Sequence, residues 1–175
     1  MITFEPFLIA PLAIQIHIVS AVISLVLVPP VLWRLRRDKW HKILGYVWIT
    51  AMVVTAMSSF WISEIKVIGR FSPLHLLAVL SLVTLYLSIR SVTKGDIRSH
   101  QQALRNLSTF GLGIPSVLNF LPGRRMSDMF FSETPMLGLI LSGSVIAMIL
   151  FWRSGLLAKT FKWVASSNRD AAQMQ

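Results

Sequence analysis

The chain has 175 residues, 54% of them apolar, with 17 basic residues against 7 acidic ones and no cysteine. Apolar runs of about 20 residues recur along nearly its whole length, which predicts a polytopic membrane protein, and the charges lie in gaps too short to form a domain that binds nucleic acid. The lack of cysteine excludes disulfides, thiolate metal sites, iron–sulfur clusters and covalently attached haem, but it does not exclude haem held by histidine.

Five apolar segments predict an all-α bundle of five transmembrane helices. We expect them at about 11–33, 40–63, 73–92, 100–121 and 135–152. Proline stands at the beginning of the first, third and fifth segments, and proline is favoured in the first turn of a helix. The opening residues, MITFEPFLIAP, lack the basic region of a signal peptide, so we expect them to lead into a retained first span.

The end of the chain has a different pattern. Residues 154–175 begin with apolar and basic side chains on separate helical faces and end in a polar run. This pattern predicts an amphipathic segment on the cytoplasmic membrane surface, followed by a disordered tail. Residues 1–153 would then form a single transmembrane domain.

The basic residues predict the orientation of the bundle. With the N-terminus outside and the C-terminus inside, 13 basic residues lie in inner segments and 4 in outer ones. Short cytoplasmic loops are enriched in lysine and arginine, so we predict this orientation in the inner membrane of a bacterium, with anionic lipid at the inner face. The densest basic cluster lies between the first two spans and consists of Arg34, Arg36, Arg37, Lys39 and Lys42.

The fourth predicted span is the most polar of the five. Its polar residues are Gln101, Gln102, Arg105, Asn106 and Asn119. These side chains are too polar to face lipid together, so we expect the helix to be enclosed by its neighbours or to line a polar cavity. Ser99 and Gln102 fit a capping box that would begin the helix at His100. Gly111, Gly113 and Pro115 predict a kink or a close contact halfway along it.

One histidine lies in or at the end of each of the first four spans: His17, His41, His75 and His100. Counting about 1.5 Å per residue from the inner boundary places His17 and His75 at one depth near the outer side. His41 and His100 share a second depth at the inner surface. Two imidazoles at equal depth on separate helices suit a porphyrin iron, so the pattern predicts haem b on either pair. The cations available for its propionates are Arg90, Arg98 and Arg105.

Two other interpretations of the histidines stay open. The same four side chains could hold a transition-metal ion, although the spans lack the carboxylates that usually accompany zinc or iron. Alternatively, each histidine could form a hydrogen bond to serine or threonine on a neighbouring helix, which needs no cofactor.

The stretches HKILGYVW and GDIRSHQQALR resemble the paired signatures of a family of bacterial predicted inner-membrane proteins of unknown function. The matching positions are His41, Lys42, Gly45 and Trp48, then Gly95, Asp96, His100 and Arg105. The resemblance covers about residues 10–123 and implies a multi-span membrane protein with no established activity. Gln101 stands where the family commonly has a basic residue. The arrangement of the four histidines also resembles that of the four-helix di-haem membrane cytochromes b.

These patterns lead to three functional hypotheses, none with a predicted catalytic residue. The first is a b-type haem protein that passes electrons between a quinone and an acceptor. The second is a structural or assembly subunit of a larger membrane complex, or a homo-oligomer. Its docking faces would be the small residues spaced by four in the last span, Gly138 with Ser142 and Gly143 with Ala147. The third is a small transporter, for which only the fourth span offers breaks and polar groups.

Overall fold

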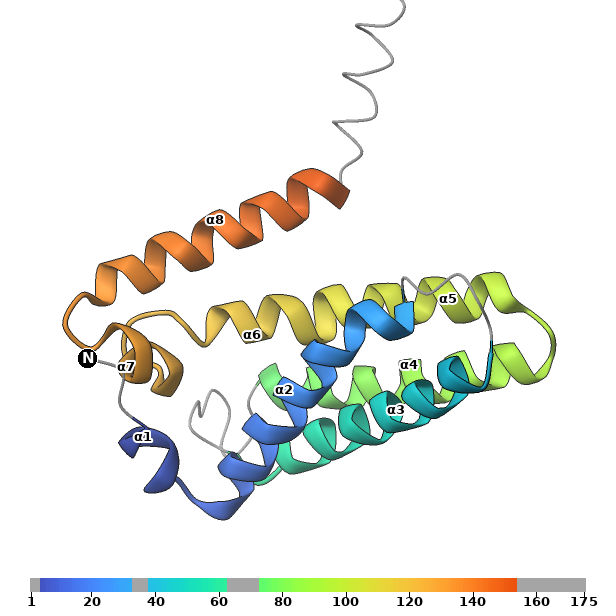
Figure 1. The fold of residues 1–175 in the computed structure, drawn as a ribbon, viewed down its shortest axis with the longest axis horizontal. Helices are drawn as coiled ribbons and strands as arrows, with labels where there is room; N and C mark the ends of the chain where they lie inside the picture. The colour runs from blue at the N-terminus through green and yellow to red at the C-terminus, as the bar shows by residue number, and fades with distance from the viewer. Residues whose placement is uncertain (1–3, 33–37, 63–72, 154–175) are drawn as a thin grey trace, which may run out of the picture.

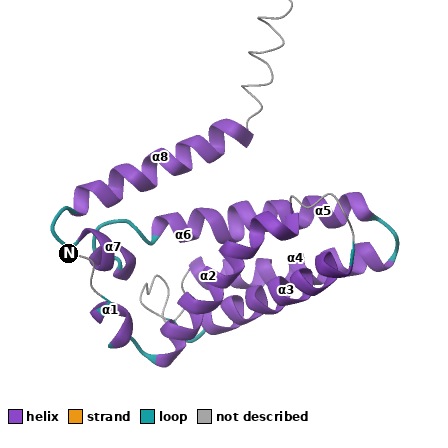
Figure 2. Cartoon of the chain, viewed as in Figure 1, coloured by secondary structure: helices purple, strands orange, loops and turns teal. Residues whose placement is uncertain are grey.

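The computed structural model describes residues 4–32, 38–62 and 73–153. Within these ranges the chain consists of helices and loops without strands, as Figures 1 and 2 show. The all-α class is therefore confirmed for the described residues. The basic cluster at 34–37 and the predicted amphipathic tail at 154–175 lie outside them.

Three long helices follow a short first one and correspond to the first three predicted spans. The short helix α1 is Glu5–Leu8, and the long helices are α2 (Leu12–Leu32), α3 (Lys39–Ser59) and α4 (Pro73–Thr93). Each long helix has 21 residues, so each measures about 31 Å, close to the thickness of the hydrocarbon core of a bilayer. All three are long and apolar enough to cross a membrane.

Aspartates mark the beginnings of two helices at the same end of the bundle. The side chain of Asp38 accepts a hydrogen bond from the backbone N–H of His41 at 3.0 Å and caps α3. Asp96 accepts from the backbone N–H of Ser99 at 3.0 Å and caps α5, Ile97–Asn106. The capping box predicted at Ser99 is therefore wrong. The helix begins three residues earlier, directly after Gly95, whose φ of 82° lets the chain turn back from α4.

The fourth predicted span is one helical run with a change of winding in its middle. It comprises α5, then the π-helix η1 (Leu107–Gly113), then α6 (Ile114–Leu118). The predicted irregularity thus takes the form of a π-helical segment, which often occurs near functional sites. Gly111 permits a close approach here, because a Cβ atom at this position would lie 2.6 Å from Leu107 Cδ1 and 3.2 Å from Ser81 Oγ.

The last two helices meet at a sharp bend beside the end of α6. Helix α7 is Arg125–Phe131 and α8 is Pro135–Arg153, and α8 is bent from α7 by 115°. Figure 1 shows α8, in orange, extending away from the other helices.

Small residues bring α8 against the end of α6, as predicted for Gly138 and Ser142. A Cβ atom at Gly138 would clash with the backbone oxygen of Phe120, and the buried Ser142 Oγ donates to Val117 O at 2.9 Å. Gly143 has no such neighbour, since a Cβ atom there would meet nothing within 4 Å. Only the first of the two predicted small-residue pairs is confirmed as a packing contact.

Within the described part of the chain, three helices are able to span a membrane. The number is four if α7 and α8 are taken together as one bent span. The run from α5 to α6 does not qualify, because α5 is strongly polar and the π-helical segment divides the run. Five spans, and the outward position of the N-terminus, stay predictions.

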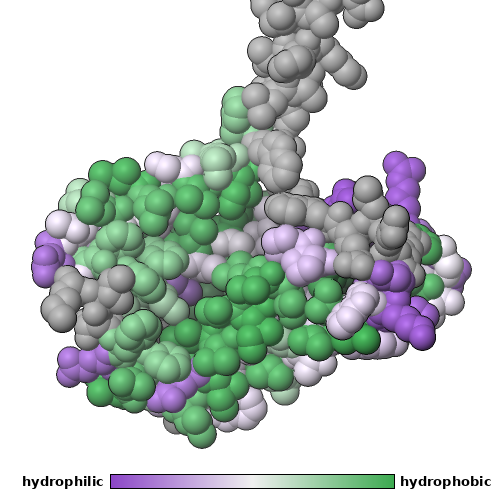
Figure 3. All heavy atoms as spheres, in the orientation of Figure 1, coloured by the Kyte–Doolittle hydropathy of each residue, from purple (hydrophilic) through white to green (hydrophobic). Residues whose placement is uncertain are grey.

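The bundle has two different ends. Large apolar side chains form one core cluster that extends from the end where α4 turns into α5, which we call the hairpin end, into the middle of the bundle. Its members are Val31, Trp48, Met52, Leu85, Leu104, Leu107 and Leu112. Trp48 is fully buried, and its Nε1–H donates to Ser24 O on α2 at 3.0 Å. Apolar side chains also cover much of the outer surface in Figure 3, as expected for contact with lipid.

Candidate functional site

A cavity of about 870 Å³ occupies the opposite end of the bundle, which we call the cavity end. Its walls come from α2, α3, α4, η1, α6 and α7, and its lining is predominantly apolar. Polar groups on the lining include His17, Thr55, Ser59, Ser116, Asn119 and Arg125. The volume lies within the range of about 300–1,000 Å³ that is typical of small-molecule sites. The size and composition suit a mainly apolar molecule with one polar region.

The cavity opens sideways along α2 and η1. Val19, Val22 and Phe110 belong to its lining and are also exposed on the outer surface of the bundle, by 48%, 47% and 45%. The opening lies along α2, a helix that is long and apolar enough to cross a membrane, so it would face the lipid where α2 spans a bilayer. A ligand could therefore enter from the bilayer without passing through water.

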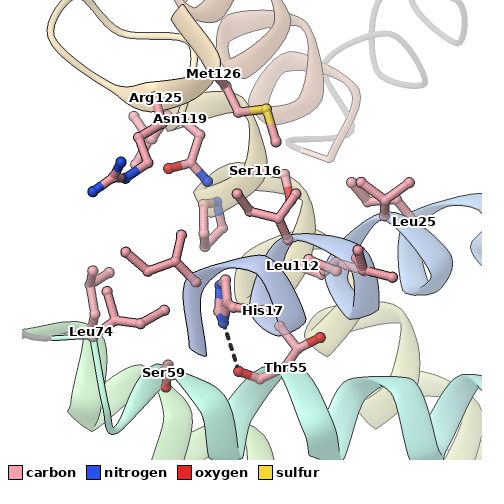
Figure 4. A pocket seen from close by; sticks show the side chains of 18 of the residues that line it. His17, Leu25, Thr55, Ser59, Leu74, Leu112, Ser116, Asn119, Arg125 and Met126 are labelled. Carbon is pink, nitrogen blue, oxygen red and sulfur yellow. Dashed lines mark hydrogen bonds between the residues drawn. The ribbon is translucent and has the colours of Figure 1, made fainter. Parts of the chain in front are cut away.

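His17 on α2 lies in the wall of this cavity (Figure 4). Its Nδ1 is 2.9 Å from the backbone oxygen of Thr55 and 3.2 Å from Ser58 Oγ, both on α3. A carbonyl oxygen can only accept, and the Ser58 hydroxyl donates its own hydrogen to Thr55 O at 3.0 Å. We therefore assign the hydrogen of the neutral imidazole to Nδ1. Nε2 is then a hydrogen-bond acceptor.

Polar contacts between α2 and α3 hold this arrangement in place. Thr55 Oγ1 is bonded to Ser20 Oγ at 2.9 Å and to Ala51 O at 2.8 Å. Two turns further toward the hairpin end, Trp48 makes its hydrogen bond to Ser24 O. These contacts between α2 and α3 fix the position of the Thr55 carbonyl that orients His17. They therefore favour one orientation of the imidazole ring.

Other polar groups face His17 from across the cavity. Figure 4 shows the second ring nitrogen of His17 directed away from Thr55, toward the side where Asn119 and Arg125 lie. Asn119 directly follows α6 as its C-cap residue, and Arg125 begins α7. Arg125 Nη1 donates to Pro6 O at 3.4 Å and so connects α7 to the segment before α2. The arrangement places acceptor and donor groups on opposite walls of an apolar space.

The other predicted histidines lie apart from this cavity lining. His75, near the beginning of α4, is buried and stacks on Phe60 with ring centroids 5.7 Å apart. His100 Nδ1 lies 2.9 Å from Ser88 Oγ and 3.0 Å from Ser88 O, which connects α5 to α4. His41 lies in the first turn of α3. The predicted cations Arg90, Arg98 and Arg105 are all exposed at the hairpin end.

The structure does not support the haem hypothesis. His17 and His75 each contact α3, and His100 contacts α4, so these contacts join neighbouring helices. Large side chains such as Trp48 and Leu104 fill the interior on the side of His41 and His100. In the part of the chain that the structure describes, no group of three histidine, aspartate or glutamate side chains could hold a metal ion. Pairing of His17 with His75, and of His41 with His100, stays a prediction.

Sequence reasoning missed Thr55 and Ser58, the residues that orient His17. The sequence could have indicated both residues, because they lie on one face of α3 near its end, at the level of His17 on the antiparallel α2. Counting depth for serine and threonine as well as for histidine would have placed them together. Arg125, which lies between the fourth and fifth predicted spans, begins a helix that lines the cavity.

The fold and the site together define a helical membrane protein with three or four helices able to span a membrane, within the described residues, and with a predominantly apolar cavity. Residues 14–113 match the family described as predicted membrane protein (DUF2306), and because the match covers more than half of the chain, the protein belongs to this family. The matched region begins in α2, includes all four histidines and ends with η1. No curated protein and no solved structure shows significant similarity to the chain.

Proposed function

We propose that this protein binds a lipid-soluble molecule with a hydrogen-bond-donating head, of the quinol type, in the cavity beside His17. The observation that carries the proposal is the hydrogen bond from His17 Nδ1 to Thr55 O, which makes Nε2 an acceptor in the cavity wall. An acceptor in an apolar cavity selects for a donor, because a buried acceptor without one costs about 1–3 kcal/mol.

The shape of the cavity supports the same class of ligand. Its lining is mostly apolar, so it would hold a hydrocarbon body, and Asn119 could make a second hydrogen bond to the head. Its lateral opening along Val19 and Val22 suits a ligand that is dissolved in the bilayer. With the predicted orientation in a bacterial inner membrane, the ligand would be reached from the outer leaflet.

One observation favours a second candidate function, electron transfer through haem b. Histidines that ligate a metal usually donate their other ring N–H to a carbonyl or carboxylate, and His17 makes such a bond to Thr55 O. His17 and His75 would then be the axial ligands. This candidate is weaker, because a bis-histidine haem needs a second imidazole facing the first, and His75 stacks on Phe60.

The test is a binding measurement with the full chain in lipid nanodiscs. Decylubiquinol and decylubiquinone are titrated against the parent protein, His17→Ala and His17→Gln, with His75→Ala as the matched control. We expect His17→Ala to weaken quinol binding about tenfold, the equivalent of about 1.4 kcal/mol for the lost hydrogen bond. His17→Gln should retain part of the affinity because its amide oxygen can accept, and His75→Ala should bind like the parent.

Three results would contradict the proposal: no saturable binding by the parent, equal binding by His17→Ala, or tighter binding of the quinone than of the quinol. An absorption spectrum of the same samples examines the second candidate. A Soret band that both His17→Ala and His75→Ala remove would favour haem instead.

A further inference from the structure

A second recess lies at the hairpin end, on the outer face of α5, and all of its lining residues are polar or charged. It measures about 330 Å³ and is lined by Arg98, Gln101, Gln102, Arg105 and Asn106. The spacing of Arg98, Gln101, Gln102 and Arg105 places them on one helical face about 10 Å long. The recess thus combines two guanidinium groups with several amide N–H donors and has no acidic side chain in its lining.

The depth of Arg105 makes this recess unusual. The contact of His100 with Ser88 fixes the register of the antiparallel helices α5 and α4. Arg105 lies five residues beyond His100, about 7 Å further from the hairpin, which corresponds to Val83 on α4. Val83 and its neighbour one turn on, Leu87, are exposed apolar side chains, 47% and 49% accessible, on a helix able to span the membrane. Arg105 therefore carries its charge to the depth of lipid-facing side chains, where an isolated cation is costly.

Acidic groups at this end are already committed to helix N-termini. Asp96, the acid nearest to Arg98 in the sequence, is the cap of α5. Its pKa is lowered, chiefly by the hydrogen bond from the Ser99 side chain, then by the one from the Ser99 backbone, and to a smaller extent by the backbone and the positive charge of Arg98. Arg98 is thus partly balanced by Asp96, whereas no acid lines the recess itself. Asp38 caps α3 in the same way. Purple charged residues gather at this end of the molecule in Figure 3, and the described ones include Lys39, Lys42, Arg90 and Lys94.

We propose that the recess on α5 binds the phosphate group of an anionic phospholipid. Arginine is suited to this task, since its planar N–H groups can bind two phosphate oxygens at once. Arg98 would meet the phosphate at the level of the headgroups, and Arg105 would reach it from below by extending its side chain toward the interface. The glutamine amides supply neutral donors to the glycerol and ester oxygens. This site is separate from the cavity beside His17 and does not depend on its ligand.

The experiment measures lipid binding by native mass spectrometry of the detergent-purified chain. The probes are phosphatidylglycerol, phosphatidylcholine and inorganic phosphate. The variant Arg98→Gln with Arg105→Gln is compared with Lys39→Gln and Lys42→Gln, which removes the same charge from the same end but from α3. We expect the arginine variant to lose about tenfold in affinity for phosphatidylglycerol, while the lysine control changes less than about twofold.

Several outcomes decide the matter. Equal losses in both double variants would overturn the proposal, because the effect would then come from the general positive field of this end. Equal affinity of the parent for phosphatidylglycerol and phosphatidylcholine would also overturn it. Stabilisation by inorganic phosphate as strong as that by the lipid would replace a lipid site by a free-phosphate site. If the double variant does not fold, Arg98→Gln alone, which leaves Arg105 in place, is expected to show an intermediate loss.

Discussion

At the hairpin end of the bundle, Trp48, Leu85 and Leu104 fill the interior, whereas at the cavity end the same helices enclose an open space beside His17. Hydropathy does not explain the difference, because the most polar helix, α5, lies at the filled hairpin end. Side-chain size does. On α3 the buried position at the hairpin end is Trp48, and the inward positions near the cavity are Thr55, Ala56 and Ser59.

The difference teaches that one bundle can separate stability from binding. Close packing at the hairpin end supplies dispersion contacts that fix the angles of the helices. The cavity end can then keep a hollow without collapse, because its walls are held by the polar contacts of Ser20, Thr55 and Ser58 with their neighbours. Changes that empty the core at the hairpin end should therefore reduce stability, whereas changes to His17 or to the volume of the cavity should mainly affect binding.

The largest effect is expected from Trp48→Ala. This change would empty the space of a fully buried side chain and remove the hydrogen bond to Ser24 O. We expect a loss of about 3–5 kcal/mol in the free energy of unfolding, measured by SDS titration in bicelles. Trp61→Ala is the matched control, because Trp61 is 70% exposed, and it should cost much less. Similar losses in the two variants would contradict the contrast between the filled and the open end.

A substitution that fills the cavity should weaken binding and leave the free energy of unfolding nearly unchanged. Ala78 lines the cavity and is buried, so Ala78→Leu would place a larger side chain in the open space. Quinol binding should weaken about tenfold, while the free energy of unfolding should change by less than about 1.5 kcal/mol because the added atoms enter a void. The neighbouring Val79→Leu, on an exposed position, serves as the control. A loss of stability as large as that of Trp48→Ala would show that the cavity is not open in the membrane.

Thr55→Val should have a smaller effect on stability and almost none on binding. The change removes the hydroxyl bonded to Ser20 Oγ but keeps the backbone oxygen that orients His17. Interhelical hydrogen bonds in membranes contribute about 0.6 kcal/mol on average, and we expect a loss of that order in the SDS titration. Loss of quinol binding in this variant would mean that the hydroxyl contacts the ligand, and the assigned role of the carbonyl would be wrong.

The smallest effect is expected at Asp96, which begins α5. Because the pKa of Asp96 is lowered in the folded chain, its contribution to stability is present above the ordinary pKa of aspartate and is lost as the pH falls through the lowered value. The protection factors of the amide hydrogens in the first turn of α5, which correct for the pH dependence of intrinsic exchange, should therefore fall in acid. Asp96→Asn should remove this pH dependence, and protection that still falls in the variant would point to a different group.

Part of the candidate site was accessible from the sequence. The spans near 11–33 and 40–63 placed His17 in a membrane helix, and an ionisable residue there indicated a functional position. The predicted partner of His17 was His75, because His75 lies at the same depth on another helix. Equal depth does not identify a partner, however, since many pairs of residues share a depth. Depth is a local property, whereas the direction of a side chain around its helix axis depends on how neighbouring helices pack. That direction brought Thr55 and Ser58 to His17 and turned His75 onto Phe60.

The sequence by itself determined that the chain is an all-α membrane protein, because a run of about 20 apolar residues forms a helix in lipid whatever surrounds it. It also determined the ends of the first three long helices within a few residues, since aspartate, proline and charge act locally. Only the tertiary structure decided the cavity, the π-helical winding of 107–113 and the 115° bend before α8. These features depend on contacts between side chains of helices that are distant in sequence, and a local sequence pattern does not specify those contacts.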